Sequence, residues 1–346
     1  MNILRKLFIP RSSAASPKGI AIFFAVLSVL FVVAFFASLC LGASDANPIR
    51  ALAAIFSGEH SGSDYLITVH IRLPRAIAAV LAGAALAVSG AIIQAALNNP
   101  MAAPNIIGVN SGAGFCAVLL MAAFPSLAGA VPAAAFLGAL AASLAIWLIA
   151  SKSGAGRVTV TLVGVAIGSI LTAGINTLKT IFPDSVYDAT VFTIGGLSGV
   201  GFDKILIPAV IIFSGLICIL LFSGGLDILS LGGETAAGLG MKVKRARFLY
   251  LMLASALAGA AVSFAGLIGF VGLLVPHIAR CFVGSSHRRL IPACILGGAF
   301  LLLACDLFAR LVFSPYEIPV GIILSLVGGP FFVILVLMRR RGELYD

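Results

Sequence analysis

The sequence predicts an all-α polytopic membrane protein with about ten transmembrane helices, an inverted internal repeat and both termini in the cytoplasm. Hydrophobic residues make up 61% of the 346 residues and charged residues only 10%, whereas a soluble domain has about 45–50% apolar and about 25% charged residues. At roughly 20 residues for each span, this composition allows about ten spans. It excludes a soluble globular domain, a disordered chain and a disulfide-stabilised scaffold.

The apolar runs define the individual spans. Residues 1–18 are polar and basic, and the run at 19–42 is longer than the core of about 7–15 residues in a signal peptide, so we interpret it as an uncleaved first span. The run at 248–280 is long enough for two short spans with a break near 266–272. Single spans are expected at residues 76–97, 106–124, 127–150, 158–182, 205–222, 290–312 and 319–338.

The basic residues indicate the orientation of these spans. With both termini cytoplasmic, the inner segments hold 16 of the 22 Lys and Arg residues and 4 of the 12 Asp and Glu residues, as the positive-inside rule requires. We therefore expect cytoplasmic tails at 1–18 and 339–346 and one transmembrane domain at 19–338. The net charge of +10 then reflects topology and attraction to anionic membrane lipid and does not indicate nucleic-acid binding.

Small residues are frequent inside the spans, where they let helix backbones approach closely. Two ridges at four-residue spacing stand out, formed by Gly83, Ala87 and Ala91 and by Ser255, Gly259 and Ser263. We interpret them as static helix packing, although they are also compatible with helices that slide.

Two breaks interrupt the apolar sequence. Residues 98–105 contain two prolines and three amides, and the second break contains three glycines spaced three apart, followed by Pro276 and His277. Non-helical backbone at membrane depth is tolerated only where it is buried in protein or lines a cavity. Similar tetrapeptides precede the breaks, AVSG at 87–90 and AVSF at 261–264, in spans expected to run in opposite directions. This pattern predicts an inverted repeat with broken helices, which is typical of a transport pathway.

Few polar side chains within the spans can carry chemistry. Asp306 and Arg310 are four residues apart and can pair along a helix, but no catalytic constellation or metal-ligand cluster emerges, and His277 is not expected to bind a metal. A membrane-embedded enzyme is therefore disfavoured. No G-x-x-x-x-G-K-[ST] motif occurs, so any ATP that drives transport must be bound by a separate subunit.

Two segments outside the spans predict partner contacts. The loop at 223–247 is expected to form two short helices separated by Gly232 and Gly233 and ended by Gly240, either as a docking knob for a cytoplasmic partner or as a membrane-surface helix. On the outer side, Arg72 and Arg75 open the second span. They either anchor lipid headgroups or recognise carboxylates, and Arg310 can complete their cluster.

Several motifs in order along the chain resemble one family of transport proteins. The sequence is similar to the FecCD-type permeases of binding-protein-dependent ABC importers, which carry iron–siderophore complexes, heme or cobalamin. The motifs are RLPR at 72–75, AALAVSG at 84–90, NPMAAP at 99–104, GVNSGA at 108–113, LGGETAAGLG at 231–240, GFVGLLVPHIAR at 269–280 and EIPVG at 317–321.

The resemblance implies a multi-pass protein of the bacterial cytoplasmic (inner) membrane. It also implies a second permease protomer, identical or paralogous, an extracytoplasmic substrate-binding protein, and two ATPase subunits that bind ATP and Mg, with no cofactor in this chain. In such permeases, arginines matching Arg72, Arg75 and Arg310 receive glutamates of the binding protein. The ATPase coupling loop corresponds to Leu226, Leu229, Leu231, Gly232, Gly233, Glu234, Ala236, Ala237, Gly238, Leu239 and Gly240. The cytoplasmic gate and broken helices correspond to Asn99, Pro100, Met101, Gly269, Gly272, Pro276 and His277.

The sequence departs from the family pattern at a few positions. Gly233 stands where the coupling loop often has an acidic residue, and Met101 and Ala103 replace a leucine and an acid in the first break. The resulting hypothesis is an importer permease that works by alternating access, powered by a separate ATPase, with substrate selected mainly by the binding protein. The alternative is an ion-coupled secondary transporter that needs no ATPase, for which only the Asp306–Arg310 pair offers an ionisable site.

Overall fold

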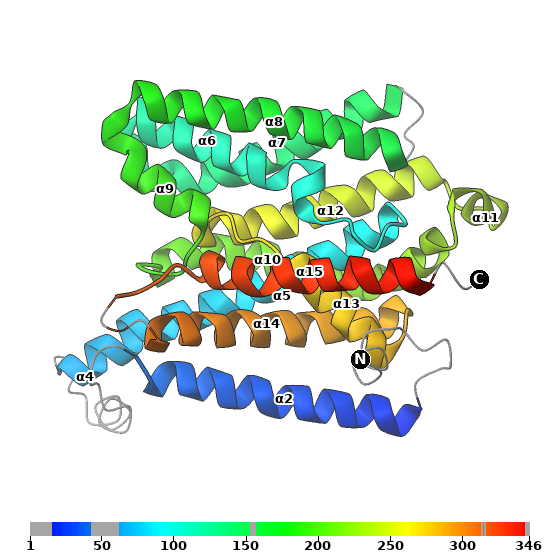
Figure 1. The fold of residues 1–346 in the computed structure, drawn as a ribbon, viewed down its shortest axis with the longest axis horizontal. Helices are drawn as coiled ribbons and strands as arrows, with labels where there is room; N and C mark the ends of the chain where they lie inside the picture. Colours follow the sequence, from blue (N-terminus) through cyan, green and yellow to red (C-terminus); the bar gives the residue numbers. More distant parts are fainter. Residues whose placement is uncertain (1–15, 43–61, 153–156, 313, 315, 343–346) are drawn as a thin grey trace.

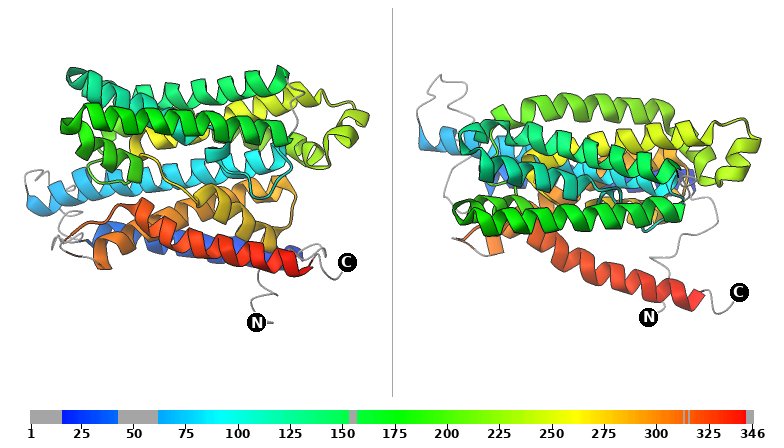
Figure 2. Two further views of the ribbon diagram at one scale, coloured as in Figure 1. Left: turned by 45° about the horizontal axis from the view of Figure 1, so that its top comes forward. Right: turned by 90° about the horizontal axis from the view of Figure 1, so that it is seen from above.

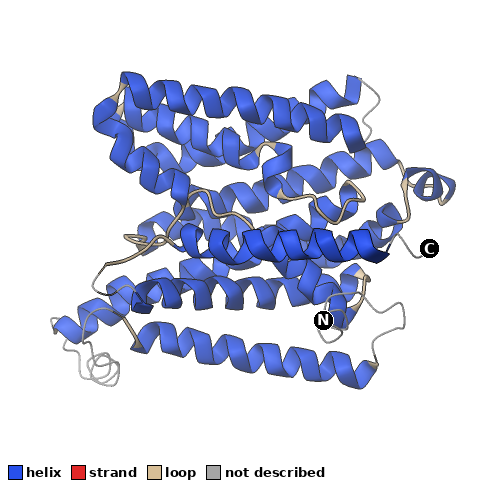
Figure 3. Cartoon of the chain, in the orientation of Figure 1, coloured by secondary structure: helices blue, strands red, loops and turns tan. Residues whose placement is uncertain are grey.

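The computed structural model describes residues 16–42, 62–152, 157–312, 314 and 316–342. Within these residues the chain is helical, with no strand, and its long helices run along one common direction (Figures 1 and 3). The long helices are α2 (Pro17–Cys40), α5 (Leu73–Ala96), α7 (Val131–Lys152), α8 (Arg157–Ile181), α10 (Phe202–Ser230), α12 (Val243–Ala265), α14 (His287–Val312) and α15 (Val320–Gly342). The shorter ones are α4 (Ser63–Tyr65), α6 (Val109–Ala123), α9 (Val186–Ile194), α11 (Gly233–Gly238) and α13 (Val271–Val283).

The helices match the expected membrane spans. Among the described residues, 7 helical segments are long and apolar enough to cross a membrane. Three shorter apolar stretches accompany them: α6, α13 and the part of α15 at Val320–Leu335. An all-helical polytopic membrane fold is therefore confirmed. The long apolar run at 248–280 forms α12 and α13 as two separate helices, as its glycines predict.

Helix α5 is the centre of the bundle. The apolar window of the segment Ser63–Ala96 is 89% buried, and α5 packs against α12, α13 and α14. Small residues permit these contacts, because a Cβ on Gly83 would overlap the backbone of Gly298 and a Cβ on Gly90 would overlap the carbonyl of Gly272. The close backbone approach expected of small residues in membrane helices is therefore present at both positions.

Both predicted breaks occur. Helix α5 ends before Asn98, whose φ is 45°, and α12 ends at Gly266, whose φ is 69°. A second left-handed residue, Phe270 with φ 65°, precedes α13. Helices α5 and α12 run in opposite directions, and a shorter helix, α6 or α13, turns back after each (Figure 1).

The loop at 223–247 differs from its prediction. The prediction of a separate first short helix in 223–247 is wrong, because α10 continues without interruption to Ser230. The helix continues because Leu226 and Leu229 are buried against the bundle, so packing outweighs the weak helix propensity of the glycines before them. Only α11 forms a separate helix, between Gly232 (φ 105°) and Gly240 (φ 85°).

The two ends of the bundle have different features. The first turn of α2, the last turn of α15 and α11 lie at one end, on the right of Figure 1, and α4 and the start of α5 lie at the other. Seen from above, α15 leans away from the other helices toward its C-terminal end (Figure 2). We refer to these as the α11 end and the α4 end.

Candidate functional site

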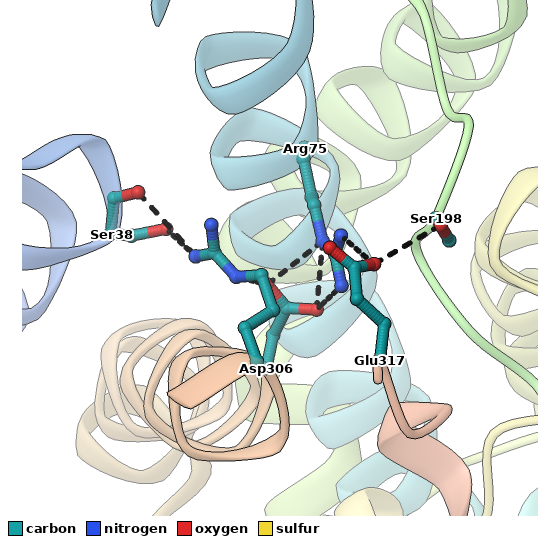
Figure 4. A network of polar contacts seen from close by, with 6 residues as sticks. Ser38, Arg75, Ser198, Asp306 and Glu317 are labelled. Carbon is teal, nitrogen blue, oxygen red and sulfur yellow. Dashed lines mark hydrogen bonds and ion pairs between the residues drawn. The ribbon is translucent and has the colours of Figure 1, made fainter. Parts of the chain in front are cut away.

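A buried ion cluster lies at the α4 end of the bundle (Figure 4). The Nε atom of Arg75 lies 3.1 Å from both carboxylate oxygens of Asp306, and its Nη2 lies 3.0 Å from Oδ1. The Nη1 atom donates to Oε2 of Glu317 at 2.7 Å. One guanidinium therefore holds two carboxylates, one from α14 and one from the connection between α14 and α15. Bidentate pairs of this kind are the stronger class of charged hydrogen bond.

Asp306 also contacts a second arginine. The pairing with Arg310 expected from their spacing is confirmed, since Arg310 Nε lies 3.1 Å from Asp306 Oδ2. The Nη2 atom of Arg310 donates to Ser38 Oγ at 2.7 Å. Asp306 is only 1% exposed, and its burial is compensated because it lies between two guanidinium groups.

Arg72 joins the cluster through α2. Its Nη1 donates to the carbonyl oxygens of Leu39 at 2.9 Å and Cys40 at 2.8 Å. Both carbonyls lie in the last turn of α2, where the helix itself supplies no N–H group to bond to them. A cation at a helix C-terminus is favoured by the helix dipole. Arg72 therefore fixes the end of α2 against the start of α5.

The three predicted docking arginines thus lie at one end of the bundle, where their side chains are buried. Arg72, Arg75 and Arg310 are 3%, 7% and 3% exposed. They are buried because Asp306, Glu317 and the carbonyl end of α2 supply internal partners for their charges. Sequence reasoning missed the Arg75 contacts, since Asp306 and Glu317 are 231 and 242 residues away along the chain and no local spacing signals them.

Glu317 is the accessible member of the cluster. Its side chain is 37% exposed, and it accepts a second hydrogen bond from Ser198 Oγ at 3.2 Å. Partial burial would raise the pKa of Glu317, but the hydrogen bond and charge of Arg75 outweigh it, so the pKa lies below its ordinary value. Glu317 is therefore an anion at neutral pH.

The residues predicted as a gate lie around the two helix breaks. Asn99 Oδ1 accepts a hydrogen bond from the Met101 amide at 3.0 Å, which stabilises the turn after α5. Gly272 contacts Gly90, and its carbonyl accepts from Gln94 Nε2 at 3.2 Å. The start of α13 is therefore fixed to the last turns of α5.

The remaining gate residues lie along and before α13. Pro276 is buried within α13, and the His277 ring meets Phe331 of α15 edge to face, with 6.1 Å between ring centroids. Gly269 lies in the break itself, with open space where a Cβ would stand, and Pro100 is exposed in the first break. Arg280 donates to Gln94 Oε1, a contact that sequence reasoning missed.

The predicted coupling segment presents apolar side chains at the α11 end. Leu231 and Leu239 are 59% and 63% exposed, whereas Ala236 is buried within the protein. The base of this segment is anchored by Asp227, which accepts from the His287 amide at 2.7 Å. Asp227 was not predicted to have a role.

Helix α8 has an exposed polar stripe. Its apolar window is only 17% buried, and its hydroxyl and amide side chains recur at helical spacing. The exposed members of the stripe are Ser169, Thr172, Asn176 and Thr180. In the last turn of α8, Lys179 contacts Thr190 and Thr193 of α9 at 3.5 and 3.3 Å.

The described residues contain no group of three or more His, Cys, Asp or Glu side chains that could hold a metal ion.

Comparison with known proteins relates the whole chain to one family. The family model described as the FecCD transport family matches residues 30–339. The chain is 37% identical over 321 residues to the Fe(3+)-citrate import system permease protein YfmE of Bacillus subtilis (strain 168), covering 92% of this chain and 95% of that protein. It is 35% identical over 323 residues to the hemin transport system permease protein HmuU of Yersinia pestis, covering 90% and 95%.

A solved structure has the same fold. It is a metal-chelate type ABC transporter in an inward-facing conformation, with a TM-score of 0.81 and 30% sequence identity, and the match covers 93% of this chain and 99% of that one.

Proposed function

This chain belongs to the FecCD transport family and is a multi-pass bacterial permease of a binding-protein-dependent ABC importer rather than an enzyme, and we propose that its substrate is a ferric chelate or heme. The proposal is supported by relatives along nearly the full length, which are named as permeases for ferric citrate and hemin. Cobalamin is the further candidate substrate that the sequence resemblance implies.

The test is uptake by reconstituted vesicles. With ATPase and binding protein present, ATP should drive accumulation of radioactive iron supplied as ferric citrate, ferric hydroxamate or hemin, and omission of the ATPase should abolish it. Accumulation by this chain alone would contradict the proposal and support the ion-coupled alternative. That alternative is weak, because its candidate carboxylate, Asp306, is already held by two arginines.

The topology we propose is a permease domain of ten spans at residues 19–338, with both tails cytoplasmic and an inverted repeat that pairs α5 and α6 with α12 and α13. It is supported by the location of α11, the start of α2 and the end of α15 at one end of the bundle. The antiparallel course of α5 and α12 supports the repeat. In this topology the α11 end is cytoplasmic and the α4 end faces outward.

Two partners then have separate docking ends. The binding protein docks with carboxylates at the α4 end through Arg72, Arg75 and Arg310, and two ATPase subunits, which bind ATP and Mg, seat against the α11 segment. The exposed leucines Leu231 and Leu239 support the second contact, because solvent-facing apolar side chains at a helix turn favour burial against a partner.

The pathway runs along α8, between this protomer and a second permease subunit. The supporting observation is the exposed stripe of Ser169, Thr172, Asn176 and Thr180. The three hydroxyls donate to carbonyls of their own helix, whereas the exposed amide of Asn176 is unfavourable against lipid and suits a water-filled passage. In alternating access, the two helix breaks at Asn99–Met101 and Gly269–Gly272 open the passage on one side at a time. Cysteines introduced at Thr172 and Asn176 should react with a water-soluble maleimide, whereas a cysteine at the lipid-facing Leu221 should not.

A further inference from the structure

The accessible bond of the ion cluster is the one between Arg75 and Glu317. Arg75 uses Nε and Nη2 for Asp306, which is 1% exposed, and Nη1 for Glu317, which is 37% exposed. A carboxylate arriving from outside therefore cannot reach Arg75 through Asp306. It can approach only where Glu317 already lies.

The side chain of Glu317 is a carboxylate, the same group that the binding protein is expected to present. Docking through this cluster requires a partner carboxylate on a guanidinium, and Glu317 already makes that bond at 2.7 Å. Two carboxylates on the same Nη1 would repel each other, since like charges at contact distance are unfavourable.

We propose that Glu317 occupies the place of a partner's carboxylate on Arg75, so that docking exchanges the internal carboxylate for the external one. This inference rests on the proposed docking function. It identifies Glu317 as a positioning residue that competes with the partner and lowers the affinity of the unloaded permease for it.

The exchange has a structural consequence beyond the docking surface. Glu317 lies three residues before α15 and accepts from Ser198 at 3.2 Å. The Gly321 amide at the start of α15 donates to the Gly195 carbonyl at 3.1 Å. The neighbouring Gly196 amide donates to Ala265 at 2.9 Å, at the end of α12. Release of Glu317 from its present position would therefore remove the Ser198 contact, one of the links between the segment before α15 and this loop, while the two backbone bonds remain.

The test compares docking affinities. The permease with its ATPase is placed in lipid nanodiscs and titrated with its cognate binding protein. Glu317→Gln removes the competing charge and should tighten docking about two- to fivefold, the range for a partly exposed ion pair. Asp203→Asn is the matched control, because Asp203 is an exposed carboxylate at the same end of the bundle that does not contact Arg75, and it should leave the affinity unchanged.

Either of two results would contradict the proposed exchange of carboxylates on Arg75. It is wrong if Glu317→Gln weakens docking or leaves it unchanged, or if Asp203→Asn tightens docking equally. Thermal unfolding of each variant checks that the chain remains folded.

A failure of the proposed docking function can be distinguished from a failure of the carboxylate exchange. Arg75→Gln should weaken docking strongly, and if it does so while Glu317→Gln has no effect, only the exchange fails. If Arg75→Gln prevents folding, the salt dependence of wild-type docking replaces it, since carboxylate docking must weaken between about 50 and about 500 mM NaCl. Docking that is independent of salt contradicts both proposals.

Discussion

The Asp227 carboxylate at the end of α10 caps the first turn of α14 by accepting a hydrogen bond from the His287 amide at 2.7 Å. The same oxygen lies 2.6 Å from Nδ1 of the His287 ring. Two helices distant in sequence are therefore joined next to α11, the segment expected to receive the ATPase.

Replacing Asp227 with alanine should destabilise the protein by about 1 kcal/mol or somewhat more, because the α14 cap is lost. Thermal unfolding of the detergent-solubilised protein measures this effect. Ser286→Ala is the control, since its bond to Asp227 is longer, at 3.3 Å, and exposed. Equal melting temperatures for the two variants would contradict the capping role.

A side chain at Gly90 should separate two helices. Its Cβ would overlap the carbonyl of Gly272, so Gly90→Val should cost about 1–3 kcal/mol or more through overpacking. The yield of monodisperse protein and its melting temperature report the loss. Gly129→Ala is the matched control because a Cβ there meets nothing within 4 Å, and a similar loss in that variant would be inconsistent with the close approach of α5 and α13.

Asp306 should be far more important for stability than Glu317. Asp306→Ala leaves two arginines buried without their shared carboxylate and should cost about 3–5 kcal/mol. Glu317→Gln removes a partly exposed pair and should cost less than about 1 kcal/mol. Chemical denaturation of both variants tests this order, and a smaller loss for Asp306→Ala than for Glu317→Gln would refute it.

The Arg75–Glu317 pair should weaken in acid. Because the pKa of folded Glu317 is lowered, its stabilising contribution is present above the ordinary glutamate value of about 4.3 and is lost as the pH falls through the lower folded value. The difference in stability between wild type and Glu317→Gln should therefore be constant near neutral pH and shrink below about pH 4. A difference that persists at acid pH would mean that the charge of Glu317 is not responsible.

Polar substitution of the exposed leucines at the α11 end should weaken binding of the ATPase to the permease without unfolding the permease. Leu231→Ser with Leu239→Ser removes side chains that are 59% and 63% exposed, so the fold should be retained while co-purification of the ATPase falls. Tyr316→Ser is the control, because Tyr316 is an even more exposed side chain, at 79%, and follows α14 at the opposite end. Retention of a stoichiometric ATPase by the double variant would exclude these leucines as the contact.

The membrane fold could be predicted from the sequence because each span is recorded locally in its apolar length and glycine content. The separation of α12 from α13 follows from three glycines in one run. The continuation of α10 through Gly224 and Gly225 could not be predicted, because it depends on burial of Leu226 and Leu229 against helices distant in sequence.

The candidate site was predictable only in part. Basic residues on the expected outer side indicate an unusual cluster, and the Asp306–Arg310 spacing predicts their contact. The burial of Arg75 and its bonds to Asp306 and Glu317 depend on how α5, α14 and the segment before α15 meet in space. Composition and periodicity carry no information on such distant pairings.

The sparse covering of α8 has a consequence for how such a permease diversifies. Since its apolar window is only 17% buried, substitutions along its outward stripe disturb few neighbours and cost little stability. Variation can therefore accumulate along this helix more readily than in the crowded α5, where an added side chain at Gly83 or Gly90 would meet neighbouring backbone.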